Sequence, residues 1–193
     1  MPLLTRLPLV YSDFRAMIAL AFPIILGQVG QMLLQVVDAA MIGRVSVEAL
    51  AAASLGSTIT HIPMLFGFGL CIPVHILGSE AYARGEIAES LRWLGIGLIV
   101  SIFFGLASAL PLLFSDYWID FLDQPEAVEP MATSYLSYLA HSLIPLFIFI
   151  CVKNFSEASQ RPWVPFWVLL AGFLSNVLLN WLLIFGNGGF PAM

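Results

Sequence analysis

Residues 27–43 read GQVGQMLLQVVDAAMIG, and this stretch decides the fold class. It is apolar enough to cross a bilayer, yet it contains three glutamines and one aspartate, Asp38. An ionised aspartate at the centre of a membrane helix costs about 2.5–3.5 kcal/mol on insertion scales. The apolar residues of this stretch predict a membrane-spanning helix. The cost of an ionised aspartate in such a helix means that the position of Asp38 must be explained.

The composition of the whole chain agrees with a membrane protein. Of the 193 residues, 60% are hydrophobic and 10% are charged, and the mean hydropathy is +0.95. Soluble domains are about 45–50% apolar and about 25% charged, so a water-soluble fold of this length could not bury so much apolar surface. No basic patch interleaved with aromatic residues is present, which gives nucleic-acid binding no support. Both cysteines, Cys71 and Cys151, lie in apolar runs and are expected to be free thiols in the core.

Five segments reach the length of about 20 apolar residues that a helix needs to cross a bilayer. They cover approximately residues 15–42, 50–77, 91–114, 131–152 and 163–185. The runs lack the alternation of a membrane β-barrel, and helices satisfy every backbone polar group internally, as lipid demands. The sequence thus predicts an all-α polytopic membrane protein, with residues 1–193 forming a single transmembrane domain.

The charged residues outside these spans predict the orientation of the chain. Six basic residues fall on one side of the predicted bilayer: Arg6, Arg15, Arg84, Arg92, Lys153 and Arg161. Only Arg44 falls on the other side, together with the acidic loop that joins the third and fourth spans. Basic loops stay in the cytoplasm, so we expect a cytoplasmic N-terminus in the cell inner membrane. The sequence ends at FGNGGFPAM, which resembles an interrupted loop, so we expect part of a longer transporter that stops before a sixth helix.

Four polar side chains share one face of the first predicted helix. A helix turns about 100° per residue, so with Gln28 at zero, Gln31 lies at about −60° and Gln35 at about −20°. Asp38 lies at about −80° on the same scale. Such a stripe must face other helices or water rather than lipid. We expect the glutamines to line a cavity; the alternative is that they only join neighbouring helices by hydrogen bonds.

Asp38 has no fixed cationic partner in this prediction, because no lysine or arginine lies inside a predicted span. Its carboxyl can hold a proton, since desolvation disfavours the charged form. It can instead remain ionised beside a bound cation. A group that changes between these states as water reaches either side of the membrane would couple ion movement to a conformational change.

The fifth predicted helix offers a partner for this carboxylate. Gly172, Asn176 and Asn180 are spaced i, i+4 and i+8 and share one face. Stacked carboxamides present oxygens to a cation and NH₂ groups to a carboxylate. An all-oxygen set with one carboxylate suits Na⁺ or a proton better than a soft transition metal. The alternative is a simple hydrogen-bond ladder between helices.

Other polar and small residues are given structural interpretations. The histidines have no cysteine or glutamate at ligand spacing and are expected to be interior or interface residues; they are His61, His75 and His141. Pro23 lies below Asp38 in the first helix and could let that helix bend. Gly67 and Gly69 in LFGFGL are expected to allow close helix packing.

Two stretches of sequence resemble the multidrug and toxic compound extrusion (MATE) transporters. The first is QVGQMLLQVVDAAMIGRVSVEALAAASLG, residues 28–56, which looks like the first two helices of that family. The second is FLSNVLLNWLLIFGNGGFP, residues 173–191, which is similar to its fifth helix and exit loop. The similarity runs over essentially the whole chain and favours the NorM-like branch.

The resemblance implies a twelve-helix exporter with two six-helix lobes, of which this chain would be most of the N-terminal lobe. Such exporters exchange organic cations for Na⁺ or H⁺, and the missing second lobe would be needed for transport. By resemblance, Asp38 matches the acid of the first helix, Asn176 and Asn180 match the coupling site, and Pro23 matches a bending proline. Some members carry an acid at the position of Asn180, so both ions stay open. No cofactor and no enzymatic activity are implied.

Three other functions compete with this interpretation. A lipid-linked precursor flippase of the same superfamily would line its cavity with basic residues, which the predicted spans lack. A non-transporting membrane scaffold would use the polar stripe only to hold helices together. An intramembrane hydrolase would need a Ser–His or a paired-Asp arrangement, and the aspartyl version fails because Asp38 is the only acid predicted well inside a span.

Overall fold

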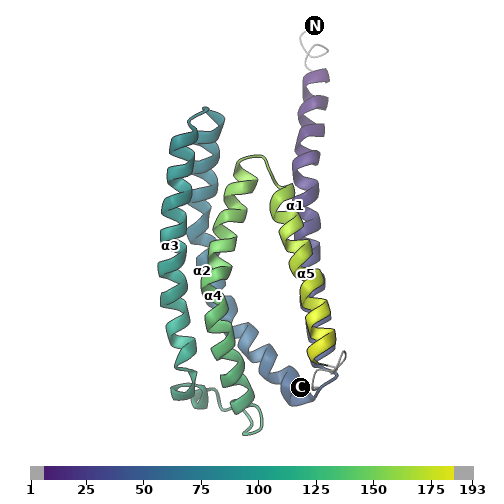
Figure 1. Ribbon diagram of the computed structural model, residues 1–193, viewed down its shortest axis with the longest axis vertical. Helices are drawn as coiled ribbons and strands as arrows, with labels where there is room; N and C mark the ends of the chain where they lie inside the picture. Colours follow the sequence, from purple (N-terminus) through teal and green to yellow (C-terminus); the bar gives the residue numbers. More distant parts are fainter. Residues whose placement is uncertain (1–6, 185–193) are drawn as a thin grey trace.

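Five long helices make up most of the computed structural model, which describes residues 7–184, with side chains from Phe14 onward. The helices are α1 (Leu7–Ile42), α2 (Val47–Ala83), α3 (Ile87–Leu113), α4 (Glu129–Ala158) and α5 (Trp163–Leu183). Two short 3-10 turns, η1 (Ser115–Tyr117) and η2 (Ile119–Leu122), lie in the loop between α3 and α4 (Figure 1). No strand occurs among the described residues.

Each of the five helices contains a stretch long and apolar enough to cross a membrane, from 21 residues in α5 to 37 residues in α2. The predicted all-α, multi-pass fold class is confirmed. Four helices are longer than the predicted spans: α1 begins at 7, α2 begins at 47 and ends at 83, α3 begins at 87, and α4 runs from 129 to 158. The added turns of α2, α3 and α4 contain Ala and Glu, and those of α4 also contain Lys153. These residues favour helix, but the charged ones lower the local hydropathy, so hydropathy underestimated the helix lengths. The predicted end of the fifth span, residue 185, lies outside the described residues.

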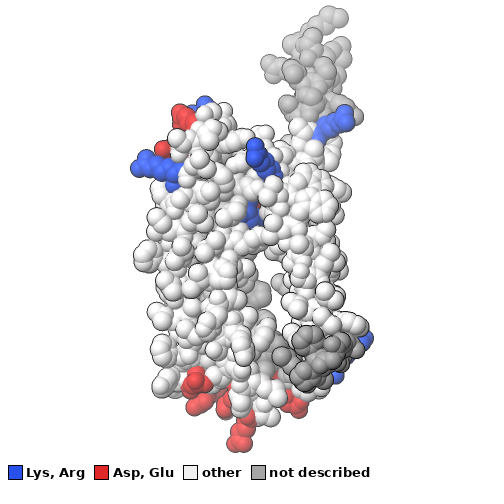
Figure 2. All heavy atoms as spheres, in the orientation of Figure 1, with Lys and Arg blue, Asp and Glu red and all other residues white. Residues whose placement is uncertain are grey.

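The helices form two groups. α2, α3 and α4 pack against one another as a three-helix bundle, while α5 packs along α1, and few contacts join the two groups. Figure 2 shows a hollow between α4 and α5. The bundle core is centred on α4, whose Leu136, Leu143 and Phe147 are almost completely buried. The ring of Phe104 from α3 meets Phe147 edge-on at a centroid distance of 5.1 Å.

A glycine lets α2 and α4 approach closely in this core. A Cβ atom built on Gly67 would overlap the ring of Phe147, whereas one built on Gly69 would meet nothing within 4 Å. Small residues at helix interfaces allow such close approach in membranes. The expectation of close packing therefore holds for Gly67 and is wrong for Gly69.

We expect Gly67→Ala to lower the thermal stability of the purified protein in detergent. The added methyl group must displace a ring that Phe104 and the helix backbone hold in place, and overpacking of this kind costs about 1–3 kcal/mol. The matched control is Gly69→Ala, which should leave the melting temperature unchanged or raise it, because alanine is the better helix former. Equal melting temperatures for the two variants would contradict the close contact at Gly67.

The two ends of the helices differ in charge, as Figure 2 shows. One end contains the described basic residues Arg15, Arg84, Arg92, Lys153 and Arg161. The other end contains Arg44 and a group of acids, which are Glu48, Asp116, Asp120, Asp123, Glu126 and Glu129. This segregation agrees with the pattern that predicted a cytoplasmic N-terminus, although the side of the membrane stays a prediction.

The position of Lys153 corrects the sequence prediction. It was placed in the loop after the fourth span, but it lies inside α4 with its Nζ atom 2.8 Å from Oε1 of Glu157. Both side chains are nearly buried, with 13% and 11% of their surfaces exposed. Both charges lie in the last two turns of α4, beyond the predicted end of the fourth span at residue 152. That no lysine lies inside a span, and that Asp38 is the only acid well inside one, therefore stay predictions. The pair is tolerated because each charge compensates the other one turn away on the same helix.

Candidate functional site

Asp38 of α1 meets the two asparagines of α5. The Nδ2 group of Asn180 donates to Oδ1 of Asp38 at 2.7 Å and to Oδ1 of Asn176 at 3.0 Å. An amide NH₂ has two hydrogens, so it can make both bonds at once, and a carboxylate only accepts, so the NH₂ group must face Asp38. The structure thus brings together three of the residues singled out in the sequence, although it does not test their roles.

The charge of Asp38 is not neutralised by a basic residue anywhere in the described part of the chain. Its only recorded side-chain partner there is Asn180, and the four ion pairs between described residues all lie near the opposite, basic end. Asp38, Asn176 and Asn180 are all half-buried. A neutral amide can hold and orient a carboxylate, but it adds no positive charge. The site can therefore accept a cation or a proton.

The packing of α1 against α5 positions these side chains. Near the basic end, the ring of Phe22 lies 6.5 Å from that of Trp163, centroid to centroid. In the middle, Gly27 brings the backbone of α1 close to Leu169, whose Cδ1 atom would lie 3.3 Å from an added Cβ. Asn176 and Asn180 follow on α5, one turn apart, and face Asp38. Gly172, which shares their predicted face, has open space around it.

A cavity of about 230 Å³ lies beside Asp38, between α1, α2 and α4. Its polar lining residues are Gln35, Asp38, Ser54, Ser57, His61 and Tyr135. The Nδ1 atom of His61 lies 2.7 Å from the backbone carbonyl of Ser57, so Nδ1 carries the hydrogen and Nε2 of the neutral ring can accept a bond. The wall that α2 contributes is therefore rich in hydroxyl and imidazole groups.

Sequence reasoning missed this wall. It treated His61 as a structural histidine and did not consider Ser54, Ser57 or Tyr135. A signal was present, because Ser54, Ser57 and His61 are spaced i, i+3 and i+7 and so share one face of the second span. The helical projection applied to the first span would have shown that these three residues share a face, but not that this face lies beside Asp38.

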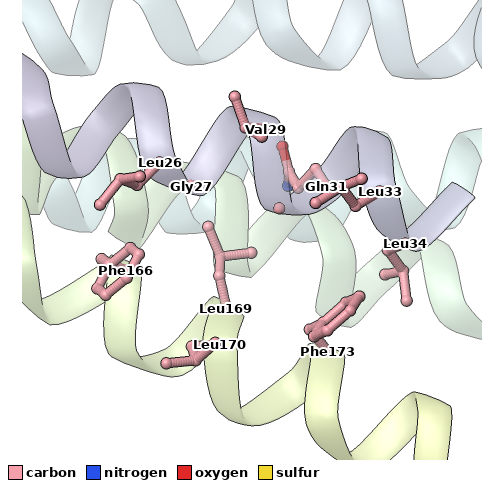
Figure 3. A pocket seen from close by; sticks show the side chains of 11 residues that line it. Leu26, Gly27, Val29, Gln31, Leu33, Leu34, Phe166, Leu169, Leu170 and Phe173 are labelled. Atoms are coloured by element: carbon pink, nitrogen blue, oxygen red, sulfur yellow. The ribbon is translucent and has the colours of Figure 1, made fainter.

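The three glutamines of α1 do not share one environment. Gln35 lines the cavity beside Asp38, and Gln31 lines a second, mainly apolar pocket of about 250 Å³ between α1 and α5. Figure 3 shows Phe166 and Leu169 of α5 pointing toward α1 in that second pocket. Gln28 is exposed and lines neither space. The role of these glutamines as a cavity lining stays a prediction.

Pro23 lies inside α1 and is almost completely buried. The helix continues through it from Leu7 to Ile42. Its side chain therefore packs within the protein rather than facing lipid, and its proposed part in bending stays a prediction.

The fold and the site together define a multi-pass α-helical membrane protein with a carboxylate–amide site between its first and fifth helices. The family model described as MatE matches residues 23–182, and the chain belongs to that family. The match confirms the family that the two resembling stretches of sequence predicted.

Several curated relatives match nearly the whole chain. A probable multidrug resistance protein NorM of Bradyrhizobium diazoefficiens is 32% identical over 182 residues, covering 94% of this chain and 39% of the relative. One of Geobacillus kaustophilus is 32% identical over 190 residues, covering 94% and 40%. The multidrug resistance protein NorM of Photobacterium profundum is 26% identical over 182 residues, with the same coverage of 94% and 40%. The chain thus spans about two fifths of the length of these relatives, and no solved structure matches it.

Proposed function

We propose that this chain is the ion-binding lobe of a secondary antiporter that exports organic, cationic and amphipathic compounds in exchange for Na⁺ or H⁺. The observation that carries the proposal is Asp38, an acid inside a membrane-spanning helix that Asn180 holds at 2.7 Å. No basic side chain pairs with it in the described part of the chain, so a mobile cation is the remaining way to neutralise it. The NorM relatives, which are named for multidrug resistance, support export of such compounds.

The proposed mechanism has two states and no covalent step. In the state open to the outside, a cation or proton enters beside Asp38, where the second carboxylate oxygen and the side-chain oxygen of Asn180 remain unused by hydrogen bonds between described residues. Hard oxygen donors of this kind suit Na⁺. The bound ion favours the state that releases the exported compound, and ion loss to the inside resets the site. Only the difference in affinity between the two states can drive this exchange.

The setting of this mechanism is also a proposal. We place the protein in the cell inner membrane with the basic end, including Arg84 and Arg92, in the cytoplasm. The exported compound would occupy a cavity to which a second lobe contributes, because the chain covers only 39–40% of the relatives considered above. The hollow between α4 and α5 would form this lobe's share (Figure 2).

The lysine in α4, Lys153, does not support the flippase alternative. A pyrophosphate site needs free positive charge, but Lys153 is already paired with Glu157 at 2.8 Å. The scaffold alternative predicts that Asp38 serves only to join α1 and α5 and that the protein exports nothing, so the presence of ion-driven efflux separates it from transport.

We expect efflux of ethidium, an organic cation, to follow an ion gradient. Cells that lack other drug pumps would express the complete chain as its gene encodes it, and the fluorescence of loaded dye would report efflux. Efflux should continue when ATP is depleted while the ion gradients are maintained, and should stop when an ionophore removes the Na⁺ or the proton gradient. Efflux that survives the loss of both gradients would exclude secondary antiport. The gradient whose removal stops efflux would identify the coupling ion.

A further inference from the structure

A groove of about 440 Å³ lies at the basic end of the bundle, where the ends of α2 and α4 meet the start of α3. It is separate from the site at Asp38, which lies near the opposite end of α1. Most of its wall is apolar and includes Ile87, Leu91, Val152 and Phe155. Its polar lining residues are Tyr82, Ser90, Ser156, Ser159 and Arg161. The groove thus combines an apolar trough with a small polar end.

One hydroxyl in this groove has no partner. Ser159 is only 8% exposed, and its Oγ atom makes no hydrogen bond to any described residue. The hydroxyls of Ser90 and Ser156 are satisfied, since they donate to the backbone carbonyls of Gly78 and Arg161. A buried hydroxyl without a partner costs about 1–3 kcal/mol. Ser159 lines the groove, although its Oγ atom is enclosed in this rotamer. A rotation about its Cα–Cβ bond would let a ligand in the groove accept its hydrogen bond.

The turn after α4 holds Arg161 in place. Gln160 adopts a left-handed backbone with φ of 57°, and its N–H donates to the carbonyl of Glu157 at 3.1 Å. The N–H of Arg161 donates to the carbonyl of Ser156 at 2.9 Å, and its own carbonyl accepts from the hydroxyl of Ser156 at 2.9 Å. The backbone of Arg161 is therefore fixed on both sides, while its side chain is exposed and lines the groove.

The guanidinium of Arg161 has no carboxylate partner among the described residues. Of the other described basic residues at this end, Arg84 pairs with Glu80 and Glu86, Arg92 with Glu89, and Lys153 with Glu157, while Arg15 on α1 lies outside the groove. The described carboxylates of this end are thus already engaged. A free guanidinium beside an unpartnered hydroxyl suits a phosphate group, which accepts hydrogen bonds from both.

We propose that this groove binds an anionic phospholipid. Its phosphate would accept hydrogen bonds from Arg161 and Ser159, and one acyl chain would cover the apolar wall formed by α3 and α4. A free phosphate would leave that wall uncovered, whereas the trough lies along membrane-spanning helices and is open to a lipid chain. Basic pockets between helices at the cytoplasmic face commonly recognise anionic headgroups.

The test is lipid binding to the complete chain purified in detergent, followed by native mass spectrometry with added phosphatidylglycerol or phosphatidylcholine. The wild type should bind phosphatidylglycerol more tightly than phosphatidylcholine. Arg161→Gln should weaken phosphatidylglycerol binding roughly tenfold or more, as expected for loss of a charged hydrogen bond. The matched control is Arg92→Gln, which removes an arginine from the same end but outside the groove, and should bind like the wild type.

A folding control and a second variant accompany this binding measurement. The turn is held by backbone and Ser156 bonds, so Arg161→Gln should fold, and unchanged melting in lipid-free detergent would verify this. Ser159→Ala should also weaken phosphatidylglycerol binding, because it removes the second donor. Equal phosphatidylglycerol binding by the Arg161→Gln and Arg92→Gln variants would overturn the proposal. So would phosphatidylcholine binding as tight as that of phosphatidylglycerol, or displacement of the lipid by inorganic phosphate at the same concentration.

Discussion

Replacement of Asp38 by asparagine is expected to abolish ion-driven efflux while leaving the protein folded. Asparagine has nearly the same size, and its side-chain oxygen can still accept the bond that Asn180 donates to Asp38 at 2.7 Å. The substitution removes only the negative charge, and with it the ability to bind a proton or to attract Na⁺. Loss of a partner that merely supports an ion ligand costs about 10–100-fold, so loss of the charged ligand itself should reduce efflux by more than about 100-fold.

The measurement is ethidium efflux from cells, combined with the amount of protein in the membrane and its melting temperature in detergent. Asp120→Asn is the matched control, because it removes the same charge from an exposed carboxylate at the same end of the protein. The control should retain wild-type efflux. Full efflux by the Asp38→Asn variant at normal expression would mean that the carboxylate only joins two helices and does not couple the ion.

The pairing of Asp38 with Asn180 was predictable because it depends on the periodicity of single helices. The polar stripe on the first span and the i, i+4 asparagines on the fifth each need a buried partner, and a carboxamide can donate to a carboxylate. The helices that carry them are long, so a boundary error of several residues did not change which faces were polar.

The cavity wall from α2 and α4 was not predictable in the same way. His61 reaches Asp38's cavity only because α2 approaches α1 near the acidic end and α4 brings Tyr135 to the same space. That arrangement is a property of tertiary packing, which no single-helix pattern encodes. Lys153 was misplaced because a lysine lowers the local hydropathy and so ends a predicted span. The glutamate one turn later lets the helix continue with both charges nearly buried.

Replacement of Asn180 by alanine is expected to weaken ion binding without abolishing it. Asn180 is the residue that bonds both Asp38 and Asn176, so alanine removes the orienting donor at 2.7 Å and separates the carboxylate from the second amide. It also removes the side-chain oxygen that we propose as an ion ligand. Groups that orient an ion ligand contribute about 10–100-fold to affinity. The Na⁺ or proton concentration that half-saturates efflux should therefore rise by about that factor.

The contrast with Asn176→Ala makes this result specific to the hydrogen-bond network. Asn176 accepts from Asn180 but has no recorded bond to Asp38, so its loss should shift the ion dependence less. Efflux would be measured across a series of Na⁺ concentrations and pH values for both variants. An Asn180→Ala variant with the wild-type ion profile would remove Asn180 from the coupling site. A larger shift for Asn176→Ala would mean that the ion lies nearer the middle of α5 than the Asp38 carboxylate allows.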